Sequence, residues 1–121
     1  MARILFCEDN PTIRRLLAVA LRGSPHEVEI AADGAEGLRL AEARLPDLIV
    51  TDISMPDMDG FALVAAVRAH PALASVPVLV MSATMERDKL ESLLAQGANG
   101  YLTKPFSPQS LRETIEAALG G

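Results

Sequence analysis

The chain has 121 residues, half of them hydrophobic but only four of them aromatic, one tyrosine and three phenylalanines. A single domain over residues 1–121 with an aliphatic core is expected. No apolar run approaches the about 18 residues that cross a membrane, and the N-terminus lacks a signal-peptide pattern. The net charge of -5, without a lysine- or arginine-rich tract, argues against direct nucleic-acid binding by this chain. Cys7 is the only cysteine, so no internal disulfide can form, which fits a reducing cytoplasm; we expect its side chain to be buried.

Five short apolar runs follow one another along the chain, each too short for a helix. They predict strands over residues 3–7, 27–31, 47–51, 76–81 and 100–103. Glu27–Ala31 alternates polar and apolar residues, so we expect it at an edge of the sheet. Val76–Met81 is continuously apolar, as a strand covered on both faces should be.

Apolar residues at helical spacing follow each strand and predict five helices. Asn10 caps the first helix ahead of Pro11, and Asp33 caps the second, with Glu36 completing a capping box. Glycine or proline closes each helix, at Gly23, Pro46, Pro71, Gly97 and Gly120. The residues expected to face the core are Ile13, Leu16, Leu17, Ala20 and Leu21; Ala35, Leu38, Ala41 and Leu45; Phe61, Val64 and Val67; Leu90, Leu93 and Leu94; and Leu111, Ile115, Ala118 and Leu119.

Regular alternation of strand and helix predicts an α/β fold, a parallel sheet with helices on both faces. Right-handed crossovers then bring the carboxyl ends of all strands to one edge of the sheet. The residues at these ends are Glu8 and Asp9, Ala31, Asp52, Ser82 and Lys104. Loop residues are often polar, but three acids, a hydroxyl and a cation form an unusual combination.

These groups together predict phosphoryl chemistry. Two carboxylates about 4 Å apart, such as those of Asp9 and Asp52, repel by about 4 kcal/mol at an effective dielectric of 20. A divalent cation removes this repulsion, and oxygen ligands without a nearby histidine or cysteine favour Mg²⁺. Lys104 is suited to hold a phosphate and Ser82 to donate a hydrogen bond, while a carboxylate is available as nucleophile.

Four segments carry a resemblance to a known family. They are Glu8-Asp9, Asp52-Ile-Ser-Met-Pro-Asp-Met-Asp-Gly60, Met81-Ser-Ala83 and Gly100-Tyr-Leu-Thr-Lys-Pro-Phe106. In this order and spacing, the chain resembles the receiver domain of bacterial two-component response regulators over essentially its whole length. It is similar to a single-domain chemotaxis-type regulator or an isolated receiver. The resemblance implies a flavodoxin-like (βα)5 fold with strand order 2-1-3-4-5.

The resemblance also implies roles for individual residues. Asp52 matches the phosphoacceptor, which takes a phosphoryl group from the phosphohistidine of a sensor histidine kinase or a histidine phosphotransfer protein. Asp9 matches the principal Mg²⁺ ligand, assisted by Glu8, Asp52 and the backbone carbonyl of Ser54. Lys104 matches the lysine that contacts the phosphoryl oxygens.

Ser82 and Tyr101 match the switch pair of the family. The hydroxyl moves toward the phosphoryl group and the ring follows inward, which alters the surface of the fourth helix, fifth strand and fifth helix. A downstream effector reads this surface, and some members form homodimers through it. Such a domain is a cytoplasmic signalling switch that promotes only its own phosphorylation and dephosphorylation, and is not otherwise an enzyme.

Some positions depart from the commonest family pattern or have more than one interpretation. Glu8 stands where Asp is more usual, so its metal contact is expected to be water-mediated, and Ser54 and Thr84 tune the phosphoryl lifetime. The family implies a cis bond before Pro105, against the trans preference of X-Pro bonds. Asp57 and Asp59 are expected to shape the turn and cap the third helix. Arg14 and Arg15 on the first helix either belong to a solvated face or help to dock a kinase. His26 and His70 have no evident partner in the sequence and are assigned no role.

Three other functions compete with this one. A flavodoxin-like flavin carrier needs a hydroxyl- and glycine-rich phosphate loop after the first strand, where Glu8 and Asp9 instead repel phosphate. A Mg²⁺-dependent phosphatase with an aspartyl nucleophile needs an acid two residues later, where this chain has Ser54. The third alternative is a receiver-like domain that shuttles phosphate or acts as a phosphorylation-independent interaction module.

Overall fold

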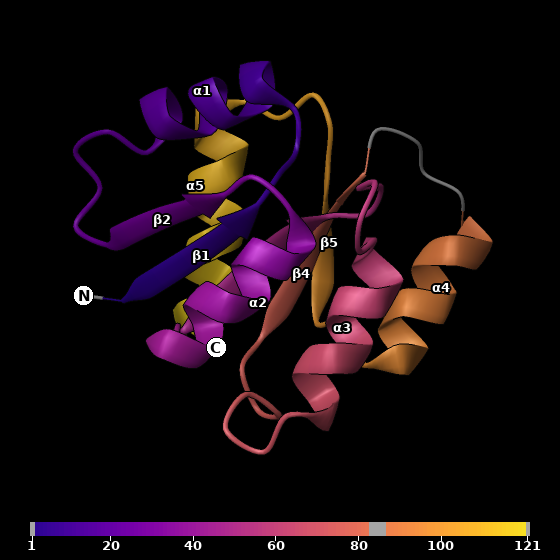
Figure 1. Ribbon diagram of the computed structural model, residues 1–121. Helices are drawn as coiled ribbons and strands as arrows, with labels where there is room; N and C mark the ends of the chain where they lie inside the picture. The colour runs from indigo at the N-terminus through magenta and orange to yellow at the C-terminus, as the bar shows by residue number, and fades with distance from the viewer. Residues whose placement is uncertain (1, 83–86, 121) are drawn as a thin grey trace.

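The structure, a computed structural model, describes residues 2–82 and 87–120. Strands and helices alternate along these residues (Figure 1). The elements are β1 (Arg3–Cys7), α1 (Pro11–Ala20), β2 (Glu27–Ala31), α2 (Gly34–Ala43), β3 (Leu48–Asp52), α3 (Gly60–Ala69), β4 (Val78–Ser82), α4 (Arg87–Gln96), β5 (Gly100–Thr103) and α5 (Pro108–Gly120). None of the helices among these residues is long and apolar enough to cross a membrane.

The five strands form one parallel sheet in the order β2-β1-β3-β4-β5. This confirms the predicted flavodoxin-like topology and the edge position of β2. Strands β3 and β4 each end one residue later than predicted, so Asp52 and Ser82 belong to them. β4 starts at Val78 and not at Val76, because Pro77 has no amide hydrogen to pair in the sheet.

Each face of the sheet carries its own hydrophobic core. Leu5, Cys7 and Ile49 point to the face covered by α2, α3 and α4. Ile4 and Phe6, on the alternate positions of β1, point to the face covered by α1 and α5 (Figure 1). Strands buried on both faces account for the continuous apolar runs in the sequence.

The predicted inward faces of the helices are confirmed for most residues, including Leu17, Val64 and Leu111. The prediction is wrong for Leu16, Leu45 and Leu94, which are 52%, 57% and 43% exposed, and for Ala35, which is also exposed. Leu16 precedes the buried Leu17 and Leu94 follows the buried Leu93, and one residue turns a helix by about 100°. Leu45 lies beyond the end of α2.

Close packing of α2 on the sheet depends on one glycine. A Cβ added to Gly37 would lie 2.2 Å from the Sγ of Cys7, which is fully buried on β1 as predicted. Burial raises the pKa of the Cys7 thiol to about 12. The thiol and the glycine therefore set the distance between α2 and β1.

Within the described residues, side-chain caps begin four of the helices; at α5 the hydroxyl of Ser107 accepts a hydrogen bond from the amide of Ser110 at 3.0 Å. Asn10, Asp33 and Asp59 accept hydrogen bonds from the first amides of α1, α2 and α3, as predicted. The prediction that Asp57 also caps α3 is wrong, since its carboxylate binds the start of α2.

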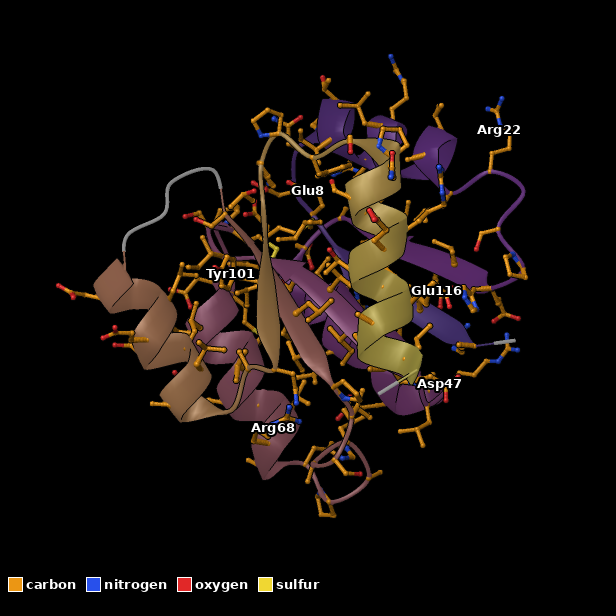
Figure 2. All side chains as sticks on the ribbon, turned by 180° about the vertical axis from the view of Figure 1, so that it is seen from behind. Glu8, Arg22, Asp47, Arg68, Tyr101 and Glu116 are labelled. Carbon is orange, nitrogen blue, oxygen red and sulfur yellow. The ribbon has the colours of Figure 1, made fainter. Side chains whose placement is uncertain are left out.

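Both histidines have partners, which corrects the expectation that they have none. His26 accepts a hydrogen bond from the amide of Ala2 through Nδ1, and its Nε2 lies 2.5 Å from Oε1 of Glu116. Glu116 projects from α5 (Figure 2). His70 pairs with Glu42 at 3.2 Å. The sequence does not reveal these contacts, because they join elements far apart in the chain.

Candidate functional site

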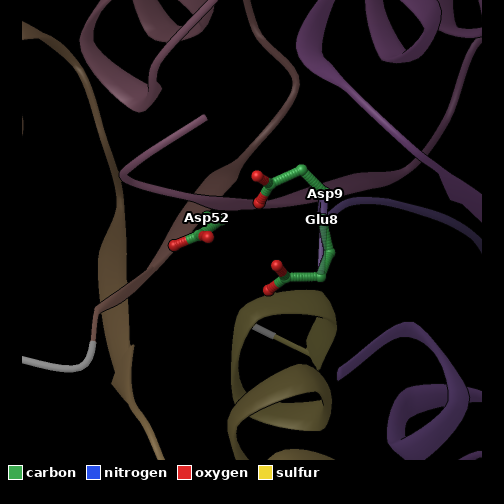
Figure 3. Close-up of side chains that lie close together, drawn as sticks. All are labelled: Glu8, Asp9 and Asp52. Atoms are coloured by element: carbon green, nitrogen blue, oxygen red, sulfur yellow. The ribbon is translucent and has the colours of Figure 1, made fainter. Parts of the chain in front are cut away.

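Three carboxylates meet at the carboxyl end of the two adjacent strands β1 and β3. The register pairs Cys7 with Thr51, so the residues that follow, Glu8 and Asp52, lie side by side. Glu8, Asp9 and Asp52 each offer a carboxylate oxygen within 4.8 Å of the others (Figure 3). The predicted clustering of acids is therefore present.

Lys104 reaches this cluster from the end of β5. Its Nζ lies 2.6 Å from Oε1 of Glu8 and 3.2 Å from Oδ2 of Asp52. The Lys104 side chain is only 13% exposed, and the Lys104–Pro105 peptide bond is cis, as predicted. The amide of Lys104 donates to the carbonyl of Ser82, which ties the base of this side chain to β4.

Glu8 is the most deeply placed member of the cluster. It has no exposed surface, and both carboxylate oxygens are bonded, Oε1 to Lys104 and Oε2 to the amide of Asn10 at 3.0 Å. Burial raises the pKa of the Glu8 carboxyl, while the two hydrogen bonds oppose that change. Glu8 therefore forms an ion pair with Lys104 in this structure, a contact that the sequence alone did not indicate.

Asp9 is more exposed than Glu8 and has a different environment. Among the described residues, no hydrogen bond or ion pair reaches its carboxylate; the guanidinium of Arg14 donates to the main-chain carbonyls of Glu8 and Asp9 instead. Arg14 is thus not part of a purely solvated face, as one interpretation held. It fixes the main chain from which both acids project.

Asp52 is 8% exposed and borders the loop that leads to α3. The amide of Ser54 lies 3.5 Å from Oδ1 of Asp52. Asp9 and this loop line a pocket of about 450 Å³, whose wall consists of Asp9, Ile53, Ser54, Met55, Pro56, Asp59 and Phe61. The main chain of Ser54 is therefore near both Asp9 and Asp52, which is compatible with its predicted role as a carbonyl ligand.

The two residues of the predicted switch lie on neighbouring strands. Ser82 ends β4 and is 3% exposed, whereas Tyr101 on β5 is 44% exposed, so it is not a core aromatic. Tyr101 pairs in register with Val80, two residues before Ser82. Tyr101 and Ser82 thus belong to the same face of the sheet. Ala83 and Thr84 lie outside the described residues.

The donor set fits a divalent cation. Three carboxyl groups and one ammonium group give a formal charge of -2, and the candidate ligand atoms are all oxygens. Hard oxygen ligands, few in number, suit Mg²⁺, which usually keeps several waters. The site thus combines a cluster of carboxylates suited to a cation with a largely buried lysine.

A family model of the response regulator receiver domain matches residues 4–116. The chain belongs to the response regulator receiver family. It is 36% identical to protein PilH of Pseudomonas aeruginosa over 122 aligned positions that cover the whole of both chains. The chain spans only about half the length of other curated relatives, 49% and 52% in two cases.

Solved receiver structures share the fold of the chain. Chemotaxis protein CheY4 of Vibrio cholerae superimposes with a TM-score of 0.93 and 37% identity, covering 98% of this chain and 99% of that one. The receiver domain of sensor histidine kinase PA1611 from Pseudomonas aeruginosa gives a TM-score of 0.90 and 31% identity, covering 99% and 98%. That receiver has a magnesium ion coordinated in its active site cleft. The chain is accordingly a CheY-like receiver domain of two-component signalling.

Proposed function

We propose that this receiver domain accepts a phosphoryl group on Asp52 from the phosphohistidine of a sensor histidine kinase or a histidine phosphotransfer protein. In this account it works in the cytoplasm as a phosphorylation-controlled switch. The observation that supports it best is the position of Asp52, with Lys104 Nζ 3.2 Å from one oxygen and an Asp9 oxygen within 4.8 Å. The Asp52 carboxylate, the proposed nucleophile, thus has the Lys104 ammonium group on one side and Asp9, a carboxylate suited to bind a metal ion, close by.

In the transfer step, Asp52 is the nucleophile and the partner's phosphohistidine is the phosphoryl donor. An oxygen of Asp52 attacks the phosphorus, an O–P bond forms and the N–P bond of the donor breaks. The electron pair of that bond stays on the donor's imidazole nitrogen, which takes up a proton from solvent. Lys104 contacts the phosphoryl oxygens and the hydroxyl of Ser82 donates a hydrogen bond to them, so both groups offset the added charge.

The residues that would hold Mg²⁺ are Asp9, Asp52 and the main-chain carbonyl of Ser54, with assistance from Glu8. The bound ion supplies positive charge that offsets the carboxylates and the phosphoryl oxygens. Two observations support this assignment, the acidic cluster of this chain and the magnesium ion of the PA1611 receiver.

The readout of the switch is proposed to run from Ser82 to Tyr101. When Ser82 turns toward the phosphoryl group, the exposed Tyr101 ring moves inward and changes the surface of α4, β5 and α5. A downstream effector recognises this surface, and homodimers can form through it. To shift such a switch from mostly inactive to mostly active, the phosphoryl contacts must favour the active state by about 5 kcal/mol. The domain promotes its own phosphorylation and dephosphorylation and catalyses nothing else.

Uptake of phosphoryl groups at increasing Mg²⁺ concentration tests this function. We expect phosphoramidate to label the wild-type chain at a rate that rises and saturates with Mg²⁺, and Asp9→Asn to lose most of that dependence. Asp47→Asn is the matched control, because Asp47 bonds the amide of Arg3 and lies far from Glu8 (Figure 2). Labelling that ignores Mg²⁺ contradicts the metal role. No labelling at all favours the phosphorylation-independent interaction module.

A further inference from the structure

The carboxylate of Asp57 lies in the loop before α3 but caps a different helix. Its Oδ2 accepts a hydrogen bond from the amide of Ala35 at 3.0 Å, and its Oδ1 lies 3.4 Å from the amide of Gly34. The next amide of α2, that of Glu36, donates to Asp33 at 2.7 Å. The first three amides of α2 are thus bound by two carboxylates, one of them more than 20 positions away in the sequence.

The loop also packs directly on the start of α2. A Cβ added to Gly34 would lie 2.7 Å from the carbonyl oxygen and 2.8 Å from the Cβ of Met58. Only glycine permits this approach. The hydrogen bond from Ala35 lowers the pKa of Asp57, so a negative charge faces the positive end of the helix dipole.

The two ends of the loop are held as well. The amide of Gly60 donates to the carbonyl of Ile53 at 2.9 Å, and Asp59 accepts from the amide of Ala62 at 2.9 Å. Residues 53–59 therefore form a closed turn whose tip is attached to α2 through Asp57. Residues 53–56 and 59 of the same turn line the pocket that Asp9 also lines.

We propose that Asp57 is a positioning residue for the acidic site. By binding α2 it fixes the turn 53–59, and so keeps the main chain of Ser54 beside Asp52 and Asp9. Asp57 acts through Ser54 and is not itself assigned as a metal ligand. The inference rests on the proposed function in one respect, the role of the Ser54 carbonyl as a ligand.

Amide hydrogen exchange of the metal-free chain and calorimetric titration with Mg²⁺ test this role. Asp57→Ala is expected to speed amide exchange selectively in residues 53–59. It should also raise the Kd for Mg²⁺ about fivefold, which corresponds to the free energy that one helix cap typically contributes. Asp57→Asn keeps an acceptor oxygen for Ala35 and should restore most of both properties. Asp33→Ala is the matched control, because it removes the other cap of α2 and leaves the turn attached.

Two results overturn the inference. In the first, Asp57→Ala exchanges in the turn and binds Mg²⁺ as the wild type does. In the second, Asp33→Ala changes both properties as much as Asp57→Ala, which assigns the effect to the stability of α2. If the wild type binds no Mg²⁺, the proposed metal site fails, while the exchange data still decide whether Asp57 orders the turn.

Discussion

Glu8 and Lys104 are separated by 96 positions in the sequence, yet Oε1 of one lies 2.6 Å from Nζ of the other. Glu8 is fully buried and the Lys104 side chain is 13% exposed, so water solvates neither charged group well. The pair holds the ammonium group 3.2 Å from Asp52. The phosphoacceptor proposed here thus has its cation in place in the structure.

Removal of one partner of this pair should be costly. Lys104→Met leaves the buried Glu8 carboxyl unpaired, and breaking a buried ion pair in this way costs about 3–5 kcal/mol. We expect a loss of this order in the free energy of unfolding, measured by urea denaturation without Mg²⁺. The double variant Glu8→Gln/Lys104→Met should recover much of the loss, because the fully buried Glu8 charge is removed and only Asp52 still lacks its cation. A double variant as unstable as the sum of the two single variants contradicts this coupling.

Gly37 should tolerate no side chain. The Cβ of Gly37→Ala would meet Sγ of Cys7 at 2.2 Å, and overpacking of a core costs about 1–3 kcal/mol. Cys7→Ala in the same chain removes the sulfur and should return part of that free energy of unfolding. Gly120→Ala serves as the control, since no atom lies within 4 Å of its added Cβ. Equal destabilisation by Gly37→Ala with and without Cys7 counts against the clash.

Cys7 should react with thiol reagents only when the chain unfolds. Burial raises the pKa of this thiol to about 12, so almost no thiolate exists at pH 8 and the sulfur is inaccessible. Alkylation by iodoacetamide, followed by intact mass, is expected to be slow in buffer and to accelerate with urea along the unfolding transition. Rapid alkylation of the native chain contradicts the packing of α2 on β1.

Asp57 should make stability depend on pH in the acid range. Its folded pKa is lowered, chiefly by the amide of Ala35, relative to about 3.9 in an unfolded chain. The stabilisation that the ionised Asp57 carboxylate gives the folded chain is therefore complete above about pH 4 and is lost as the pH falls through the lower folded pKa. Thermal unfolding of wild type and Asp57→Asn is expected to differ by a constant amount above that pH and to converge below it. A difference that grows on acidification contradicts this assignment.

Much of the fold follows from local patterns in the sequence. The apolar runs of β1 and β4 and the helix starts at Asn10 and Asp33 are visible because a strand or a cap depends on adjacent residues. The strand order came from the family resemblance. The meeting of Asp9 and Asp52 was predictable because the carboxyl ends of parallel strands share one edge of the sheet.

The missed features all depend on contacts between distant segments. No local pattern contains the relative positions of the elements. Three contacts depend on those positions: the hydrogen bonds to both Glu8 oxygens, the binding of Asp57 to α2 and the pairing of His26 with Glu116. The exposure of Leu16 and Leu94 depends on the rotation of each helix on the sheet. A single apolar residue beside the inward line does not reveal that rotation.

The most direct test of the proposed function is to find the residue that carries the phosphoryl group. The chain is incubated with Mg²⁺ and phosphoramidate, its intact mass is measured, and the adduct is mapped to a peptide. We expect one phosphoryl group, stable in acid and labile in base, on Asp52, and no such adduct in Asp52→Asn. An adduct on another residue, or equal labelling of Asp52→Asn, would contradict it.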